Sequence, residues 1–253
     1  MNTRKLTRLL SAVLFVWTLT LVLAPTLQTS LCAALPTGGS GWTLTENPDG
    51  GWTLIDTVDF NDWTRQNMNG SGADSTGGLT VLTGSNFLYS TSATGDHQVN
   101  RFYNGLTIQP GTYTITFSVG RLNTPDGFLS PGFSGLVSGS WSWNNRITTG
   151  RTASATNTAP ASENWSTWSV TYTIDADTTV GGGTAPRPTV VGTTLGFAIL
   201  ANGNGSTANY AFDNLTITYA PFPTVPEPAE TAVFAGAMFL LLAVTLRHCR
   251  RHR

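Results

Sequence analysis

Tryptophan side chains are the groups in this chain that are best suited to bind a ligand. Trp141 and Trp143 are two residues apart, so on a strand their side chains would share a face, and Trp165 lies near the start of another expected strand. The electron-rich face of an exposed indole stacks on the C–H groups of a sugar ring. The sequence therefore predicts sugar stacking at these three residues. Burial in the core is the competing interpretation, because tryptophan is usually mostly buried.

Residue types that carry enzymatic chemistry are scarce in the central part of the chain. Both cysteines, Cys32 and Cys249, belong to the terminal segments, His97 is the single central histidine, and Glu46 and Glu163 are the only central glutamates. Glycoside hydrolysis requires two carboxylates that flank the scissile bond, and no nucleophile-elbow sequence occurs in an α/β context. We therefore expect a non-catalytic protein, with an enzyme acting on polysaccharide as the lesser alternative.

Charge makes a nucleic acid an unexpected partner. The central part has no lysine and twelve acidic residues, so its net charge is near −6, and its basic residues are six arginines: Arg65, Arg101, Arg121, Arg146, Arg151 and Arg187. Phosphate binding requires a basic face. Abundant Gly, Ser, Thr and Asn with little charge is instead typical of an extracellular β-protein.

Alternation of apolar and polar residues predicts strands throughout residues 35–224. The clearest run is Thr112–Val119, where every second residue is apolar, and a turn sequence at Asn47–Gly50 predicts a hairpin over Gly41–Asp56. No segment in this range has a helical period. The fold class expected is all-β, with a single jelly-roll-type β-sandwich spanning residues 35–224. Further strands are expected where the apolar residues alternate at Trp168, Val170, Tyr172 and Ile174, and at Leu195, Phe197, Ile199 and Ala201.

The alternation changes phase near the end of this range. Tyr210 and Phe212 share one parity, whereas Leu215, Ile217 and Tyr219 share the other, which predicts a β-bulge at residues 213–214. The stretch 210–217 resembles the closing strand of galactose-binding-like jelly rolls, which include many carbohydrate-binding modules. The sequence Pro-Gly-Thr-Tyr at 110–113 is similar to a strand opening in the same group.

That resemblance implies a structural calcium ion, which such jelly rolls often bind. Asp59, Asp62 and Asp213 would supply the hard oxygen ligands that calcium prefers. Turn capping and the bulge are competing roles for these aspartates, because their spacing does not match an EF-hand. No other cofactor is expected.

The first 34 residues have the pattern of a secretory signal peptide. A basic start with Arg4, Lys5 and Arg8 precedes an uncharged apolar stretch and small residues up to Ala34, after which we expect cleavage. An uncleaved anchor helix is one alternative. A lipoprotein signal at Cys32 is another, although Leu31 stands where a small residue is expected.

An uncharged apolar segment at 231–246 predicts a short transmembrane helix, followed by the basic tail 247–253. Sixteen helical residues reach about 24 Å, against a hydrocarbon core of about 30 Å, and local thinning with arginine snorkelling makes up the difference. A buried core helix is the alternative. Basic residues beyond the helix and in the signal peptide both belong on the cytoplasmic side, which places the intervening domain on the far side of the membrane.

The segment 225–253 resembles the PEP-CTERM sorting signal of Gram-negative bacteria. Val225, Pro226, Glu227 and Pro228 match the sorting motif, and an apolar helix and an arginine cluster follow in the required order. Both prolines disfavour helix, so Glu227 is presented in an extended segment. The resemblance implies an exosortase-type membrane transpeptidase as the partner. The protein would be anchored transiently in the inner membrane with its body in the periplasm, then reach the outer envelope or extracellular matrix.

Two functions fit these observations. The first is a non-catalytic surface or matrix protein that acts by adhesion or matrix building. The second is a carbohydrate-binding module that recognises exopolysaccharide through its tryptophans. Burial of both Trp141 and Trp143 would remove the stacking surface and exclude the second.

Overall fold

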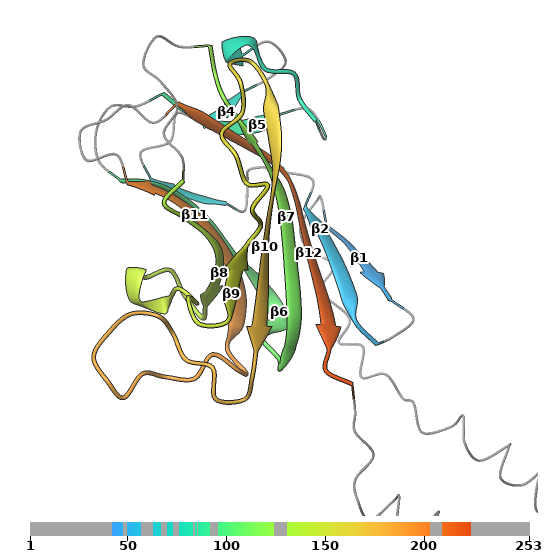
Figure 1. Cartoon of the computed structure of the whole chain (residues 1–253), viewed down its shortest axis with the longest axis vertical. Coiled ribbons are helices and arrows are strands. Elements are labelled where there is room, and N and C mark those ends of the chain that lie inside the picture. The colour runs from blue at the N-terminus through green and yellow to red at the C-terminus, as the bar shows by residue number, and fades with distance from the viewer. Residues whose placement is uncertain are drawn as a thin grey trace, which may run out of the picture.

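Two antiparallel sheets pack face to face in the part of the chain that the structure describes (Figure 1). The computed structural model describes residues 42–47, 50–56, 63–66, 70–72, 76–82, 84, 86–91, 96–123, 131–202 and 209–223. The expected signal peptide (1–34), the expected sorting signal (225–253), Asp59 and Asp62 lie outside these residues. Within the described ranges, no helical segment has the length and hydropathy that a membrane crossing requires.

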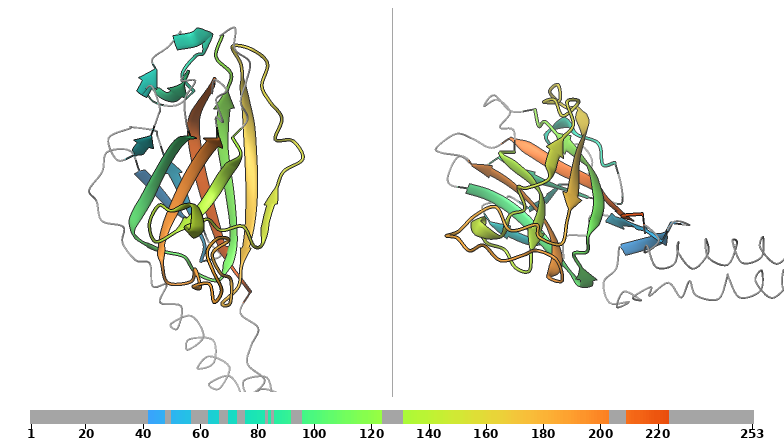
Figure 2. Two further views of the ribbon diagram at one scale, coloured as in Figure 1. Left: turned by 90° about the vertical axis from the view of Figure 1, so that its left-hand side faces the viewer. Right: turned by 60° about the horizontal axis from the view of Figure 1, so that its bottom comes forward.

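The larger sheet has eight strands in the order β1-β2-β12-β7-β10-β9, with β5 also paired to β12 and β4 paired to β5. The smaller sheet has four strands in the order β3-β6-β11-β8. Figure 2 shows the two layers from other directions. The elements are β1 Trp42–Glu46, β2 Trp52–Asp56, β3 Thr64–Gln66, β4 Gly70–Gly72, η2 Thr76–Gly78, β5 Phe87–Ser90, β6 Asp96–Thr107, β7 Gly111–Gly120, β8 Phe133–Ser138, η3 Trp143–Asn145, β9 Arg151–Ala153, β10 Trp165–Ile174, β11 Thr194–Asn202 and β12 Tyr210–Pro221.

This architecture confirms the predicted all-β sandwich and several of its strands. The hairpin β1–β2 turns at Asn47, whose carbonyl accepts a hydrogen bond from Gly50 N at 3.1 Å. In β7 the alternation of threonines with apolar residues places Tyr113, Ile115 and Phe117 in the core. Strands β10 and β11 also coincide with the predicted alternating segments.

The main core lies between the two sheets and is rich in aromatic rings. Phe117 from the larger sheet meets Phe197 from the smaller one with ring centroids 5.6 Å apart, and Phe212 lies 5.9 Å from Phe117. A smaller apolar cluster lies on the opposite face of the four-stranded sheet. Because Phe197 and Ile199 of β11 point into the main core, Ala198 and Leu200 point away from it and pack with Phe133 and Val137.

The predicted bulge in β12 is confirmed. Pairing between β12 and β7 shifts register between Asp213 and Thr216, and Asn214 has a left-handed φ of 57°. The bulge therefore separates two segments of β12. On the side away from β7, the first segment pairs with β5 and the second pairs with β2.

Candidate functional site

The connection that follows β8 forms a short loop containing two of the three predicted binding tryptophans. Gly139 leaves the strand with φ 72°, and Ser142 caps the 3₁₀ turn η3 by accepting a hydrogen bond from Asn144 N at 3.3 Å. The chain then returns to the edge of β8, where Ile147 N donates to Leu136 O at 3.0 Å. Both ends of the loop are thus fixed to the same edge strand.

Trp143 is the exposed aromatic residue of this loop. Half of its side chain is accessible to solvent, at 50%. The guanidinium carbon of Arg146 lies 3.1 Å from the centroid of its ring, and Arg146 Nε donates to Trp143 O at 2.8 Å. A carbon this near the centroid must lie over the ring face. The cation therefore covers one face of the indole and leaves the opposite side as the exposed one.

Two arginines flank the Phe133 ring at this edge of the sandwich. The guanidinium carbon of Arg146 lies 5.2 Å from the Phe133 centroid, and that of Arg151 lies 5.8 Å from it. Arg151 is held by Nη2, which donates to Ser134 O at 3.1 Å. Partial burial lowers the pKa of Arg146 from its usual value, although a guanidinium remains charged at neutral pH.

The long connection between β10 and β11 lies next to the 3₁₀ turn η3 and is hydrogen-bonded to it (Figure 1). Gly181 N donates to Arg146 O at 2.6 Å, and Gly182 N donates to Asn144 O at 3.2 Å. A Cβ atom at residue 181 would approach Thr148 Oγ1 to 2.1 Å, and one at residue 182 would approach Asn144 Cα to 2.5 Å. Glycine at residues 181 and 182 is therefore required for this close approach.

Trp141 and Trp165 occupy different environments from Trp143. Trp141 is half-buried and packs against the cluster of Phe133 and Leu200. Contrary to the expectation of a shared strand, Trp141 and Trp143 both lie in the loop. Trp165 begins β10 as predicted, and its Nε1 donates to Thr80 O at 2.8 Å. Trp165 lies seven residues, roughly 23 Å, along β10 from the position that pairs with Arg151. The structure therefore does not bring the three tryptophans together.

Of the three predicted calcium ligands, Asp213 lies within the described residues, and its side chain forms hydrogen bonds at the β12 bulge. Its Oδ2 accepts a hydrogen bond from Leu82 N at 3.0 Å, and its Oδ1 accepts one from Asn214 N at 2.8 Å. Among the described residues no group of three or more His, Cys, Asp and Glu could hold a metal ion. Since Asp59 and Asp62 lie outside those residues, calcium binding stays a prediction.

Glu163, a candidate carboxylate for the enzyme alternative, lies in the exposed turn before β10. It has a left-handed φ of 60°, and its Oε1 accepts a hydrogen bond from Asn123 Nδ2. The contact joins the turn before β10 to the residues after β7. Glu163 therefore belongs to the connection between the paired strands β9 and β10.

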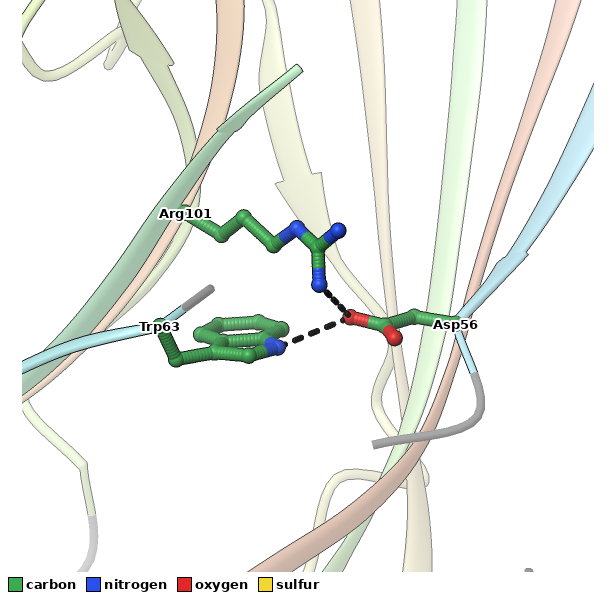
Figure 3. A network of polar contacts seen from close by, with 3 residues as sticks. All are labelled: Asp56, Trp63 and Arg101. Carbon is green, nitrogen blue, oxygen red and sulfur yellow. Dashed lines mark hydrogen bonds and ion pairs between the residues drawn. The ribbon is translucent and has the colours of Figure 1, made fainter. Parts of the chain in front are cut away.

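A polar group inside the sandwich was not predicted from the sequence. Asp56 of β2 and Arg101 of β6 point toward each other across the interior, with Trp63 beside them (Figure 3). Asp56 Oδ2 lies 3.9 Å from Arg101 Nη1 and accepts a 3.0 Å hydrogen bond from Trp63 Nε1. Burial and, secondarily, the charge of Asp56 raise the pKa of Tyr103 well above its usual value, while Arg101 acts in the opposite direction. These side chains connect the two sheets. They are nearly inaccessible to solvent, so they present no surface to a ligand.

The Trp143–Arg146 pair has a weak signal in the sequence. Residues three apart face each other on a helical turn, and Ser142 before Trp143 is a favourable N-cap. Reading this stretch as a short helical turn would have placed the arginine over the indole. The expectation of a strand instead paired Trp143 with Trp141.

No protein-family model matches the chain, and no curated protein matches its sequence. Among solved structures, the chain is similar to the Stig cyclase Fisc from Fischerella sp. TAU at 16% identity, with a TM-score of 0.38, over 74% of this chain and 92% of that chain. An apo-form cyclase from Fischerella sp. is similar at 17% identity, with a TM-score of 0.40, over 75% and 92%. The CBM22-1 xylan-binding domain of Paenibacillus barcinonensis Xyn10C is similar at 12% identity, with a TM-score of 0.37, over 74% and 100%. At these values neither a ligand nor an activity carries over to this chain.

Proposed function

We propose that the β-sandwich is a non-catalytic carbohydrate-binding domain whose contact surface is the exposed face of Trp143. The observation that carries the proposal is the 50% exposure of a tryptophan whose other face is covered by Arg146. A large apolar ring held in one orientation at the surface presents a flat area to a sugar ring. The turn around it is fixed by hydrogen bonds, so little conformational freedom is lost on binding.

Polar groups next to the indole suit a sugar ligand. Asn144 follows Trp143 and is exposed, and Asn145 is anchored by its Nδ2, which donates to Ser140 O at 2.9 Å. Sugars combine apolar C–H faces with hydroxyl edges, so a ring beside amides matches both kinds of surface. One aromatic ring provides a weak site. We therefore expect low affinity for a single saccharide unit.

Exposure of Trp141 and Trp143 is the observation that separates a carbohydrate-binding domain from a matrix protein without a sugar ligand. Trp143 is exposed and Trp141 is half-buried, so the stacking surface is present at one of the two residues. This favours carbohydrate binding over purely structural adhesion. Both functions are compatible with a protein of the cell surface or matrix.

Export and sorting form the second part of the proposal, and the sequence supports it. The Val225–Pro228 motif, the apolar segment 231–246 and the basic tail 247–253 are in the order of a PEP-CTERM signal. In this proposal an exosortase-type transpeptidase recognises the motif and releases the domain from the inner membrane. The sugar-binding domain would then meet exopolysaccharide in the outer envelope or the matrix.

Affinity electrophoresis in gels containing soluble polysaccharides tests the binding part. The full chain in mild detergent is compared with Trp143→Ala and with Phe222→Ala, which removes an exposed aromatic residue, 38% accessible, near the end of β12. We expect at least one polysaccharide to retard the wild type and Phe222→Ala, and Trp143→Ala to migrate freely. Equal retardation of all three proteins would refute the role of Trp143.

Cell fractionation tests the sorting part. Glu227→Ala and deletion of residues 231–253 should each change the fraction in which the protein is found and the size of its mature form. The matched control is Glu230→Ala, which removes a nearby carboxylate outside the Val225–Pro228 motif. Unchanged processing of Glu227→Ala and of the deletion would contradict the sorting proposal.

A further inference from the structure

Positive charge is concentrated at the edge of the sandwich that holds Trp143. The central part of the chain is acidic overall, yet two of its six arginines, Arg146 and Arg151, flank the single ring of Phe133. The distances of 5.2 and 5.8 Å to that ring place their guanidinium carbons at most about 11 Å apart. This is close to the Debye length of about 8–10 Å, so an anion at this edge would feel both charges.

Neither arginine is neutralised by an acidic side chain of the described residues. The ion pair recorded among them is Asp56 with Arg101, inside the sandwich. Asp175 and Asp177 are exposed in the turn that follows β10, without an ion pair to either arginine. Two neighbouring cations repel each other, and an anionic ligand bound between or beside them would offset this repulsion.

Arg146 retains hydrogen-bonding capacity at its two terminal nitrogens. Its Nε is engaged with Trp143 O at 2.8 Å, and the structure records no bond from its terminal nitrogens to a described residue. The guanidinium fork binds a carboxylate or sulfate through two parallel N–H groups. Arg151 is more constrained, because its Nη2 donates to Ser134 O, so it contributes mainly charge.

We propose that the ligand of the Trp143 site is an acidic polysaccharide, in which one sugar ring stacks on the exposed side of the indole and a carboxylate or sulfate group of the same polymer reaches past the edge of the indole to Arg146, with Arg151 nearby. This inference rests on the proposed function, because it assigns the class of polysaccharide that the same site selects. The arginine that supports the indole from one side also recognises the charge of the ligand. A neutral polysaccharide would use the indole alone and bind more weakly.

Paired polymers that differ in charge test the inference: polygalacturonate against its methyl ester, and dextran sulfate against dextran. Binding by the full chain in detergent is measured by affinity electrophoresis at low and high salt. The variants are Arg146→Gln and the matched control Arg65→Gln, which removes the same charge from the exposed strand β3 at the opposite edge of the four-stranded sheet. Trp143→Ala is included to report on the stacking surface itself.

We expect the wild type to bind the charged member of a pair roughly fivefold or more tightly than the neutral member, as one partly exposed ionic contact allows. Arg146→Gln should lose this preference while still binding the neutral member, and Arg65→Gln should keep it. High salt should reduce the preference in the wild type.

Two results would overturn the inference and leave the proposed function intact. One is equal binding of charged and neutral members through Trp143. The other is an equal loss of both members in Arg146→Gln, which would make Arg146 a support for the indole and nothing more. If no polymer is bound, or if Trp143→Ala binds as the wild type does, the proposed function fails together with the inference.

Discussion

Asp56 and Arg101 form an ion pair across the interior of the sandwich, 3.9 Å apart, and each comes from a different sheet. Trp63 Nε1 donates a hydrogen bond to the same carboxylate oxygen, so this oxygen faces one hydrogen-bond donor and one cation. A buried pair of this kind adds little net stability but makes each partner depend on the other. It also fixes how β6 lies against β2 at this end of the molecule.

Arg101→Met should lower the free energy of unfolding by about 3–5 kcal/mol, because it leaves the Asp56 carboxylate buried without its cation. The double variant Asp56→Asn with Arg101→Met should recover part of that loss, since it removes the orphaned charge as well. Urea denaturation followed by circular dichroism measures both values. A loss below about 1 kcal/mol in Arg101→Met would contradict a role for this pair in joining the sheets.

Trp168 and Trp143 should respond differently to truncation. Trp168 is 6% exposed, and its Nε1 donates to Thr158 O at 3.0 Å, so Trp168→Ala should cost about 3–5 kcal/mol of unfolding free energy. Trp143→Ala, at a half-exposed site, should cost no more than about 1 kcal/mol. Thermal and chemical denaturation of both variants provide the comparison. A large loss in Trp143→Ala would indicate that this residue serves the fold.

Stability should decline as the pH rises above about 10. Burial raises the pKa of Tyr172 to about 12, with the positive charge of Arg151 acting in the opposite direction, and burial also raises the pKa of Tyr113 and Tyr210. The unfolded chain ionises its tyrosines at about pH 10, so above that pH it holds fewer protons than the folded protein. The stabilisation is therefore complete below pH 10 and is lost as the pH rises through the folded values.

Urea midpoints measured between pH 9 and pH 12 test this decline, with tyrosinate absorbance as the reporter of ionisation. Absorbance of the native protein should lag behind that of the urea-unfolded protein. Coincident titration curves would show that the buried hydroxyls ionise without unfolding, contrary to this account.

The bulge residue Asn214 should tolerate glycine and resist β-branched residues. Its φ of 57° lies in the left-handed region, which costs other L-residues roughly 1–2 kcal/mol. Asn214→Gly should therefore leave the unfolding free energy nearly unchanged, and Asn214→Val should lower it by about that amount. Equal stability of the two variants would mean that β12 adopts another register.

The sequence predicted those strands in which one face is buried and the other is solvated. Strand β7 alternates strictly, and the loss of phase after Phe212 located the bulge correctly. Strand β6 was missed because its inward face includes His97 and Arg101, which interrupt the apolar pattern. In β8 every residue is buried, so the segment shows no alternation at all.

The candidate site was predicted in part. The residue types pointed to tryptophan as a candidate for sugar stacking, and Trp143 has the exposure that stacking requires, while sugar binding itself stays a prediction. Local sequence did not reveal that Trp165 lies far from Trp143, because this separation depends on where along β10 the strand β9 pairs. The approach of Arg146 and Arg151 to one ring is likewise a consequence of two edge strands meeting, and long-range pairing leaves no periodic signal in the chain.

The contact between Trp143 and a saccharide can be observed directly through the indole N–H signals in a ¹⁵N–¹H correlation spectrum of the full chain in micelles. Trp143→Phe assigns the Trp143 signal, and Trp168, buried at 6% exposure, is the internal reference. On addition of an oligosaccharide from a polymer that retards the protein, this account predicts that the Trp143 signal shifts progressively to saturation while the Trp168 signal stays in place. Saturable binding of the saccharide with an unshifted Trp143 signal would contradict it.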